Sequence, residues 1–353
     1  MNGVPFICID PHLVSLPQVD RCSSDDVEDF ISAVVDWAST ADGKCTSAFV
    51  SSVVLDAIDD DDAFPWGSKL EALLKHYGVR SVSAVNVVQA VQFLLGCARI
   101  DDTIGIKSVL LEPSKTNLSA RFMRERLRPR TQQAFDDMLA ILSLAQTGVG
   151  DVDNIAIGSM PGEGEKATLA YISFAAEVAD IEWSSPPQGK TVICPYQIDG
   201  KLSVFFSRSG LLEKIEPVSL WPDDEDVDKA KHAIDCCIAR LIASGASEEN
   251  KKPYVIASRF LKSADDWQCG RDGRHNFTLI ESCARLVLGI PKHDIGEFRD
   301  NKTGKQKVRD GCAVACRTHV TKHGAGLRLM FWELADGTIE FANVGDKDEL
   351  VMS

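Results

Sequence analysis

The first element of the chain is the stretch Pro5-Phe-Ile-Cys-Ile-Asp10, a short apolar run that is closed by Asp10-Pro11. An apolar run of this length, bounded by turn residues, predicts a buried strand. The segment that follows predicts an amphipathic helix, capped at Ser23 or Ser24 and ended at Gly43. Its buried face is formed by Val27, Phe30, Ile31, Val34 and Val35. A strand followed by such a helix indicates an α/β arrangement at the start of the chain.

The chain of 353 residues is longer than one compact core usually holds, so several lobes are expected. We predict a mixed α/β and α+β protein with three lobes. Residues 1–148 form a helix-rich α/β lobe, residues 149–222 an antiparallel β unit, and residues 223–353 a basic α+β lobe. Within the middle unit, Asp199-Gly200 is typical of a hairpin turn.

Charge is distributed unevenly along the chain. Residues 1–250 carry 21 Lys and Arg against 38 Asp and Glu, net −17, and residues 251–353 carry 17 against 14, net +3, which together give the −14 of the chain. From Lys252 to Arg328 there are 15 basic and 8 acidic residues, net +7. The net negative charge argues against a protein that coats nucleic acid non-specifically, because such binding depends on Lys and Arg side chains that neutralise phosphates. Any contact with a polyanion must therefore be local.

Composition places the chain among ordinary globular proteins, with 44% hydrophobic residues and a mean hydropathy of −0.06. We find no apolar run that approaches the length of a membrane span, so no membrane contact is expected. Eleven cysteines are scattered without a framework of spacings. This pattern favours a reducing cytoplasm, and we expect neither a metal site nor a cofactor.

The most suggestive segment for function lies near the C-terminus. A basic loop precedes strands expected at Cys312–Val320, Ala325–Leu334 and Thr338–Val344. Alternate residues share a strand face, so Arg317 and His319 point the same way. We predict that Arg317, Arg328 and His319 are catalytic if RNA is cleaved, with cations holding phosphate and the imidazole moving a proton. The predicted nucleic-acid-binding residues are Lys302, Lys305, Lys307, Arg309 and Lys322.

Three stretches carry a family resemblance: Arg317-Thr-His-Val320, Leu327-Arg-Leu-Met-Phe-Trp332 and Asp336-Gly-Thr-Ile-Glu-Phe-Ala-Asn-Val-Gly345. Together they resemble the closing strands of the RelE/ParE-like toxin fold. The chain as a whole resembles uncharacterised bacterial proteins associated with phage defence. The resemblance implies a component of an anti-phage or toxin-like system, with RNA a better ligand than DNA and a protein partner in a defence complex. The chain departs from such toxins after Gly345, where Asp346-Lys-Asp-Glu-Leu350 would repel RNA.

Two alternatives remain open from the sequence. In the first, Asp10, Asp56 or Asp59, and Asp101-Asp102 resemble the carboxylates of a PIN-like nuclease, which hold Mg²⁺ or Mn²⁺ for phosphodiester hydrolysis. In the second, the protein is a non-enzymatic adaptor, and its acidic body docks against a basic partner through the run Asp59–Asp62. The sequence leaves open whether any bond is broken.

Overall fold

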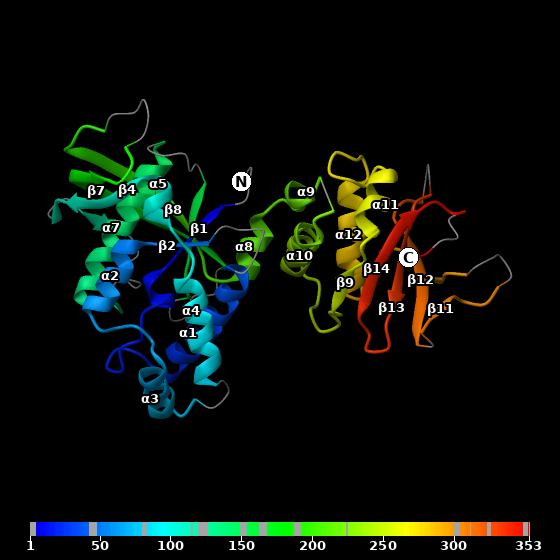
Figure 1. Cartoon of the computed structure of the whole chain (residues 1–353), viewed down its shortest axis with the longest axis horizontal. Coiled ribbons are helices and arrows are strands. Elements are labelled where there is room, and N and C mark those ends of the chain that lie inside the picture. The colour runs from blue at the N-terminus through cyan, green and yellow to red at the C-terminus, as the bar shows by residue number, and fades with distance from the viewer. Residues whose placement is uncertain are drawn as a thin grey trace. The chain divides into compact units, whose positions relative to one another are not determined.

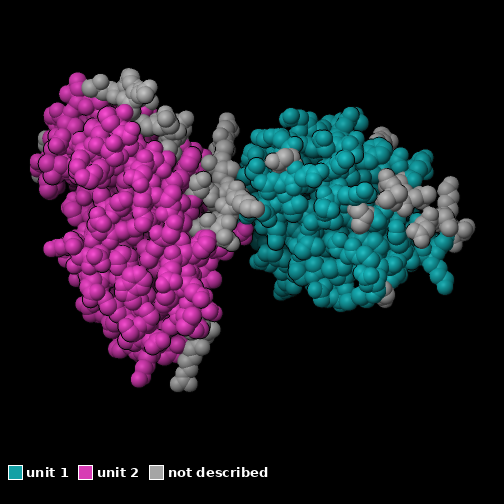
Figure 2. All heavy atoms as spheres, viewed as in Figure 1, with its two compact units in different colours: residues 1–4, 212–353 teal, residues 5–211 magenta. Residues whose placement is uncertain are grey.

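A computed structural model of the chain shows two compact units, divided within helix α8 (Arg208–Lys214). The N-terminal unit comprises residues 5–211, and the C-terminal unit is built from residue 212 onward (Figure 2). The structure describes residues 5–41, 48–79, 83–113, 116–118, 126–148, 154–161, 168–186, 192–223, 225–299, 304–310, 312–322, 326–348 and 352.

A mixed sheet forms the centre of the N-terminal unit (Figure 1). Its strands are β1 (Phe6–Ile9), β2 (Ala48–Val50), β3 (Ala98–Arg99), β4 (Ile106–Leu111), β5 (Asn117–Leu118), β6 (Ile155–Gly158), β7 (Leu169–Trp183) and β8 (Tyr196–Phe205). They are ordered β3-β2-β1-β6-β8-β7-β4, and β5 pairs with β7. The first five strands of that order run parallel, while β7 is antiparallel to β8, β4 and β5. The strand order changes direction at β1, because β2 and β3 lie on one side of it and the later strands lie on the other.

Helices cover this sheet. They are α1 (Ser24–Ala41), α2 (Ser52–Asp60), α3 (Gly67–Tyr77), α4 (Ala84–Leu95), α5 (Ile100–Ile104) and α7 (Pro129–Gln146), with a short 3₁₀ helix, η1 (Pro11–Leu13). The helix expected after the first strand is confirmed as α1, and Val27, Phe30, Ile31 and Val34 on it are buried. Val35, which was also expected on the buried face, is exposed. Helix α7 is buried around most of its surface, because it packs against β8, β7, β4 and α2.

The strands of the predicted middle unit, residues 149–222, belong to the N-terminal sheet. Strand β6 pairs with β1 and β8 pairs with β6, both in parallel, so these strands extend the sheet that β1 begins. The turn predicted at Asp199-Gly200 is wrong, because both residues lie inside β8, opposite Ala175 and Phe174. Gly200 has a packing reason there: a Cβ atom would lie 2.7 Å from Oγ of Ser143 on α7.

The C-terminal unit contains a second mixed sheet. Its strands are β9 (Tyr254–Ile256), β10 (Gly296–Glu297), β11 (Val308–Arg309), β12 (Ala313–His319), β13 (Arg328–Glu333) and β14 (Ile339–Gly345), in the order β10-β12-β13-β14-β9 with β11 paired to β12. The three strands expected at the end of the chain are confirmed as β12, β13 and β14. Helices α9 (Pro217–Leu220), α10 (Val227–Ala243), α11 (Phe260–Asp266) and α12 (Asn276–Val287) complete this unit.

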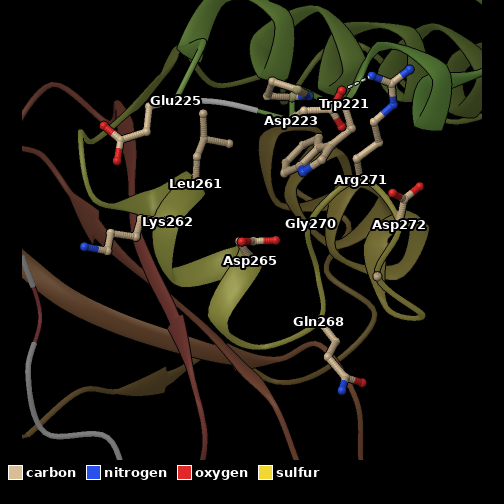
Figure 3. A pocket seen from close by; sticks show the side chains of 12 residues that line it. Trp221, Asp223, Glu225, Leu261, Lys262, Asp265, Gln268, Gly270, Arg271 and Asp272 are labelled. Atoms are coloured by element: carbon tan, nitrogen blue, oxygen red, sulfur yellow. Dashed lines mark hydrogen bonds and ion pairs between the residues drawn. The ribbon is translucent and has the colours of Figure 1, made fainter.

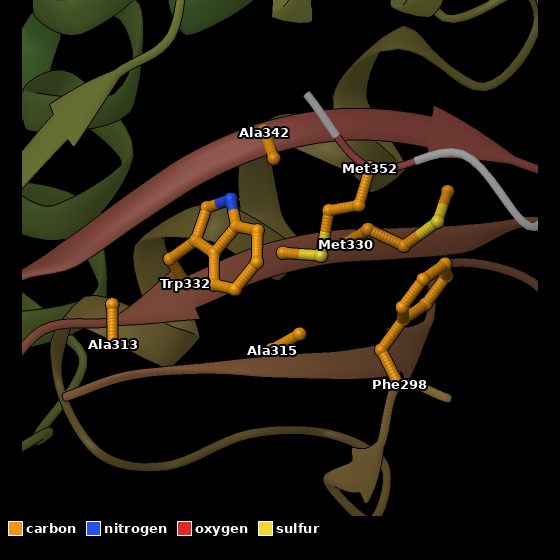
Figure 4. Close-up of a cluster of buried hydrophobic side chains, with 7 residues drawn as sticks. All are labelled: Phe298, Ala313, Ala315, Met330, Trp332, Ala342 and Met352. Carbon is orange, nitrogen blue, oxygen red and sulfur yellow. The ribbon is translucent and has the colours of Figure 1, made fainter. Parts of the chain in front are cut away.

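Each face of the C-terminal sheet packs against a different core. On one face, Phe341 contacts the rings of Tyr254 and Phe260, each at a centroid distance of 5.8 Å, which joins β14 to α11. The other face carries a second cluster (Figure 4), formed by Phe298, Ala313, Ala315, Met330, Trp332, Ala342 and Met352. The fold is thus mixed α/β, as predicted. Among the described helices, none combines the length and apolar character that a bilayer crossing requires.

Candidate nucleic-acid interface

The sheet face that holds the Figure 4 cluster continues into cationic residues. Alternation along β12 places Arg317 and His319 on the same face as Ala313 and Ala315. In the antiparallel register, His319 lies directly opposite Arg328 of β13. Side chains that face each other in such a pair have Cβ atoms about 5 Å apart. The three residues predicted to be catalytic therefore lie together at one end of this face.

Arg299 follows β10, whose Gly296 lies opposite Arg317 on β12, and it is close enough for its charge to act on the Arg317 guanidinium. Burial, and then the charges of Arg328 and Arg299, lower the pKa of the Arg317 guanidinium. A guanidinium nevertheless stays charged at neutral pH. Arg299 forms an ion pair with Glu297 at 2.6 Å, whereas no carboxylate among the described residues pairs with Arg317. We call Arg299, Arg317, His319, Lys322 and Arg328 the cationic cluster.

A second histidine lies beside this cluster. The rings of His293 and His319 meet edge to face, with centroids 6.1 Å apart. Burial, followed by the charges of Lys322, His319 and Lys292, lowers the pKa of His293, and Asp294 opposes the shift. Nδ1 of His319 is buried and has no hydrogen-bond partner among the described residues.

Arg328 and the segment after β14 are held together by a backbone contact. Nη1 of Arg328 donates to the carbonyl of Lys347 at 3.1 Å, while Asp346 uses its carboxylate to accept from the backbone N–H of Asp348 at 2.8 Å. The described acids of the segment predicted to repel RNA therefore lie near the cluster, but no ion pair between them and Arg328 is observed in the described part of the chain. Within the cluster, Arg317 and Arg328 therefore have no carboxylate partner among the described residues, whereas Arg299 is paired with Glu297.

The remaining predicted binding residues do not join the cluster as a group. Arg309 donates to Glu340 through both terminal nitrogens, at 2.9 and 2.5 Å, and its guanidinium lies 4.7 Å from the ring centroid of Trp332. This neutralised, stacked arrangement is structural. Lys305 is exposed and Lys307 is partly buried beside β11, and Lys302 lies outside the described residues.

Sequence reasoning missed Arg299 and His293 as members of the site. Both come from the segment around β10, which is only two residues long and pairs with β12 out of sequence order. The backbone of His293 is anchored when Thr318 of β12 donates through Oγ1 to its carbonyl, at 3.2 Å. A two-residue strand carries no periodic signal, so this pairing was not visible in the sequence.

Two of the N-terminal carboxylates of the PIN-like alternative, Asp10 and Asp101, are already hydrogen bonded. Asp10 is fully buried at the end of β1, where it accepts from Nδ1 of His12 at 2.5 Å and from the Ser159 hydroxyl at 2.9 Å. Asp101 accepts from the Ser51 hydroxyl at 3.0 Å. Asp56 and Asp102 are exposed. Within the described ranges, no group of three or more His, Cys, Asp or Glu side chains could hold a metal ion.

The acidic run of the adaptor alternative is largely paired within its own unit. The contacts are Asp60 with Arg130 at 2.5 Å, Asp61 with the Thr131 hydroxyl at 2.7 Å, and Asp62 with Lys69 at 2.5 Å. Asp59 is exposed. Because these acids already have partners on the same unit, the run offers less negative charge to a basic partner than its sequence indicates.

A cavity of about 590 Å³ lies elsewhere in the C-terminal unit, between the α9–α10 connection and the α11–α12 segment (Figure 3). It is lined by Trp221, Pro222, Asp223, Glu225, Leu261, Lys262, Asp265, Gln268, Gly270, Arg271, Asp272 and Gly273. Carboxylates outnumber cations in this lining, and Arg271 is paired with Asp223. The cavity is therefore poorly suited to a polyanion, which leaves the cationic cluster as the better candidate.

Comparison with known proteins adds no assignment: no family model, no curated protein and no solved structure matches this chain.

Proposed function

We propose that the protein is a nucleic-acid-binding component of a bacterial anti-phage or toxin-like system, and that its cationic cluster contacts RNA. The observation that carries this proposal is the convergence of Arg317, Arg328 and His319 on one sheet face, without a carboxylate partner for Arg317 among the described residues. Adjacent guanidinium groups repel one another unless an anion lies between them. A phosphate backbone supplies that anion at regular spacing.

The Arg309 contacts also support this choice of surface. Arg309 is a structural cation of this sheet: a bidentate carboxylate neutralises it and an aromatic ring packs against it. Arg317 lies on the same sheet face and has neither among the described residues. An arginine that lies next to other cations without a carboxylate partner destabilises the fold by charge repulsion. Binding of an external anion explains its position better than a role in stability does.

The test is RNA binding by the double variant Arg317→Gln/Arg328→Gln. Two phosphate contacts are lost, so we expect the Kd for a labelled single-stranded RNA to rise at least about tenfold in fluorescence anisotropy. The control is Arg271→Gln, which makes the same kind of substitution in the same unit but removes one positive charge, at a residue paired with Asp223. Unchanged affinity in the double variant, or an equal loss in the control, contradicts the proposal.

The two alternatives give different results in the same assay. A PIN-like nuclease loses cleavage in EDTA and in Asp10→Asn, while its activity survives the Arg317→Gln/Arg328→Gln change. An adaptor binds no RNA, and its complex with a basic partner weakens at Asp59→Asn, which replaces an exposed acid of the run.

A further inference from the structure

Two imidazole rings lie next to the proposed phosphate contacts. His319 projects from β12 on the face of Arg317, and His293 reaches it from the loop before β10, with 6.1 Å between ring centroids. Thr318 fixes that loop by donating to the carbonyls of His293 and Asp294, each at 3.2 Å. The arrangement of the rings is therefore set by the sheet itself, as acid–base catalysis requires.

The two rings differ in their surroundings. The groups that face His293 are Lys292 and Asp294 beside it, Lys322 after β12, and His319. Burial, and then the charges of Lys322, His319 and Lys292, lower the pKa of His293, which favours the neutral ring, the form that accepts a proton. His319 lies across from Arg328 and next to Arg317, where a scissile phosphate would be held.

We propose that His293 and His319 are the base and the acid of a metal-independent RNA cleavage, an inference that rests on the proposed RNA binding. His293 removes the proton of a ribose 2′-hydroxyl, and the 2′-oxygen forms a bond to the adjacent phosphorus. The bond from phosphorus to the 5′-oxygen breaks, and His319 donates a proton to that oxygen. The products are a 2′,3′-cyclic phosphate and a 5′-hydroxyl, so no other reactant is consumed. Arg317 and Arg328 stabilise the charge that develops on the phosphoryl oxygens.

This chemistry defines the substrate class. The nucleophile comes from the substrate, so a strand without 2′-hydroxyl groups is bound but cannot be cut. DNA and 2′-O-methyl RNA are therefore expected to remain intact, and the latter measures binding without cleavage.

The test uses the full chain, a labelled single-stranded RNA and EDTA. We expect wild type to cleave it and to leave a 2′,3′-cyclic phosphate. His293→Ala and His319→Ala should each lower the cleavage rate at least about 100-fold, the effect typical of a lost general acid or base. The affinity of both variants for 2′-O-methyl RNA should stay close to that of wild type. The matched control is His76→Ala on α3, an exposed histidine in the other unit, which should cleave normally.

The pH dependence provides a readout that a purely structural role would not produce. Since the pKa of His293 is lowered, the rising limb of the wild-type rate should have its midpoint below about 6.5, the ordinary value for imidazole. The pH dependence of the rate and the 2′,3′-cyclic end group are both measured on the wild-type protein. They therefore test the roles of His293 and His319 even if His293→Ala fails to fold.

The outcomes separate the two proposals. Wild type that binds 2′-O-methyl RNA but leaves RNA intact in EDTA overturns the histidine pair and preserves the proposed RNA binding. Wild type that binds neither strand overturns both. Cleavage that requires Mg²⁺, or that persists at the wild-type rate in both histidine variants, also overturns the pair.

Discussion

Asp137 on α7 has a carboxyl group whose pKa is raised to about 6. Burial is the main cause, Asp136 adds to it, and a hydrogen bond from Gln133 at 3.0 Å opposes it. A raised acid pKa means that the folded state holds the proton more tightly than the unfolded state does. Stability therefore falls as pH rises from about 4 to about 6, and the loss persists above that window. Asp137→Asn should raise the free energy of unfolding at pH 7 by about 1 to 3 kcal/mol.

Urea unfolding at pH 4 and pH 7 measures this effect. Asp137→Asn should differ from wild type at pH 7 and much less at pH 4, where the folded state holds the proton and the unfolded state is about half protonated. The control is Asp62→Asn: Asp62 is exposed and paired with Lys69, which lowers its pKa, so its loss should bring no stabilisation at pH 7. A gain from Asp137→Asn that is equal at both pH values would contradict the explanation.

At the scale of elements, the turn from α5 to β4 depends on Gly105. Its φ is +81°, and an added Cβ atom would collide with the carbonyl oxygen of Ser185, which follows β7. Gly105→Ala should lower the free energy of unfolding by about 2 to 4 kcal/mol, since left-handed strain and a backbone clash add. Gly78→Ala isolates the strain alone, because Gly78 has a φ of +68° and no atoms near the added Cβ.

We expect Gly78→Ala to cost only about 1 kcal/mol in the same chemical denaturation experiment. Equal losses at the two positions would mean that the approach of Ser185 does not constrain the turn.

The elements that the sequence predicted well are those in which burial of one face is a local pattern. The helix with Val27 and Phe30 and the strand with Arg317 and His319 both follow from spacing alone. Pairings across long separations were not accessible in this way. Glu340 neutralises Arg309 from 31 residues away, and β10 brings Arg299 to Arg317, so the membership of the site depends on register. The turn prediction at Gly200 was wrong because the lack of a side chain is compatible both with a turn and with close packing of a strand against a helix.

At the scale of the whole molecule, the net charge of −14 disfavours RNA binding, whereas the local cationic cluster favours it. The proposed RNA contacts through Arg317, Arg328 and Lys322 would release counterions. We therefore expect log K to fall with log salt concentration with a slope of about −2, as for about three phosphate contacts to a single strand. Anisotropy titrations in KCl from low to high concentration measure the slope.

The Arg317→Gln/Arg328→Gln variant should have a slope that is smaller in magnitude by about 1 to 2. Arg271→Gln should keep the wild-type slope. A slope near zero for wild type would mean that the cluster does not neutralise phosphates.

Strand β14 lies between β13 and β9, and it is made after both of them. While the nascent chain emerges from the ribosome, β9 has no strand to pair with until Ile339 and its neighbours have been synthesised, some 85 residues later. Closing so long a loop is slow, because its entropy is lost before the pairing is gained. The sheet that carries the proposed RNA contacts should therefore be complete only after β14 has been translated, which would delay the final folding of the C-terminal unit.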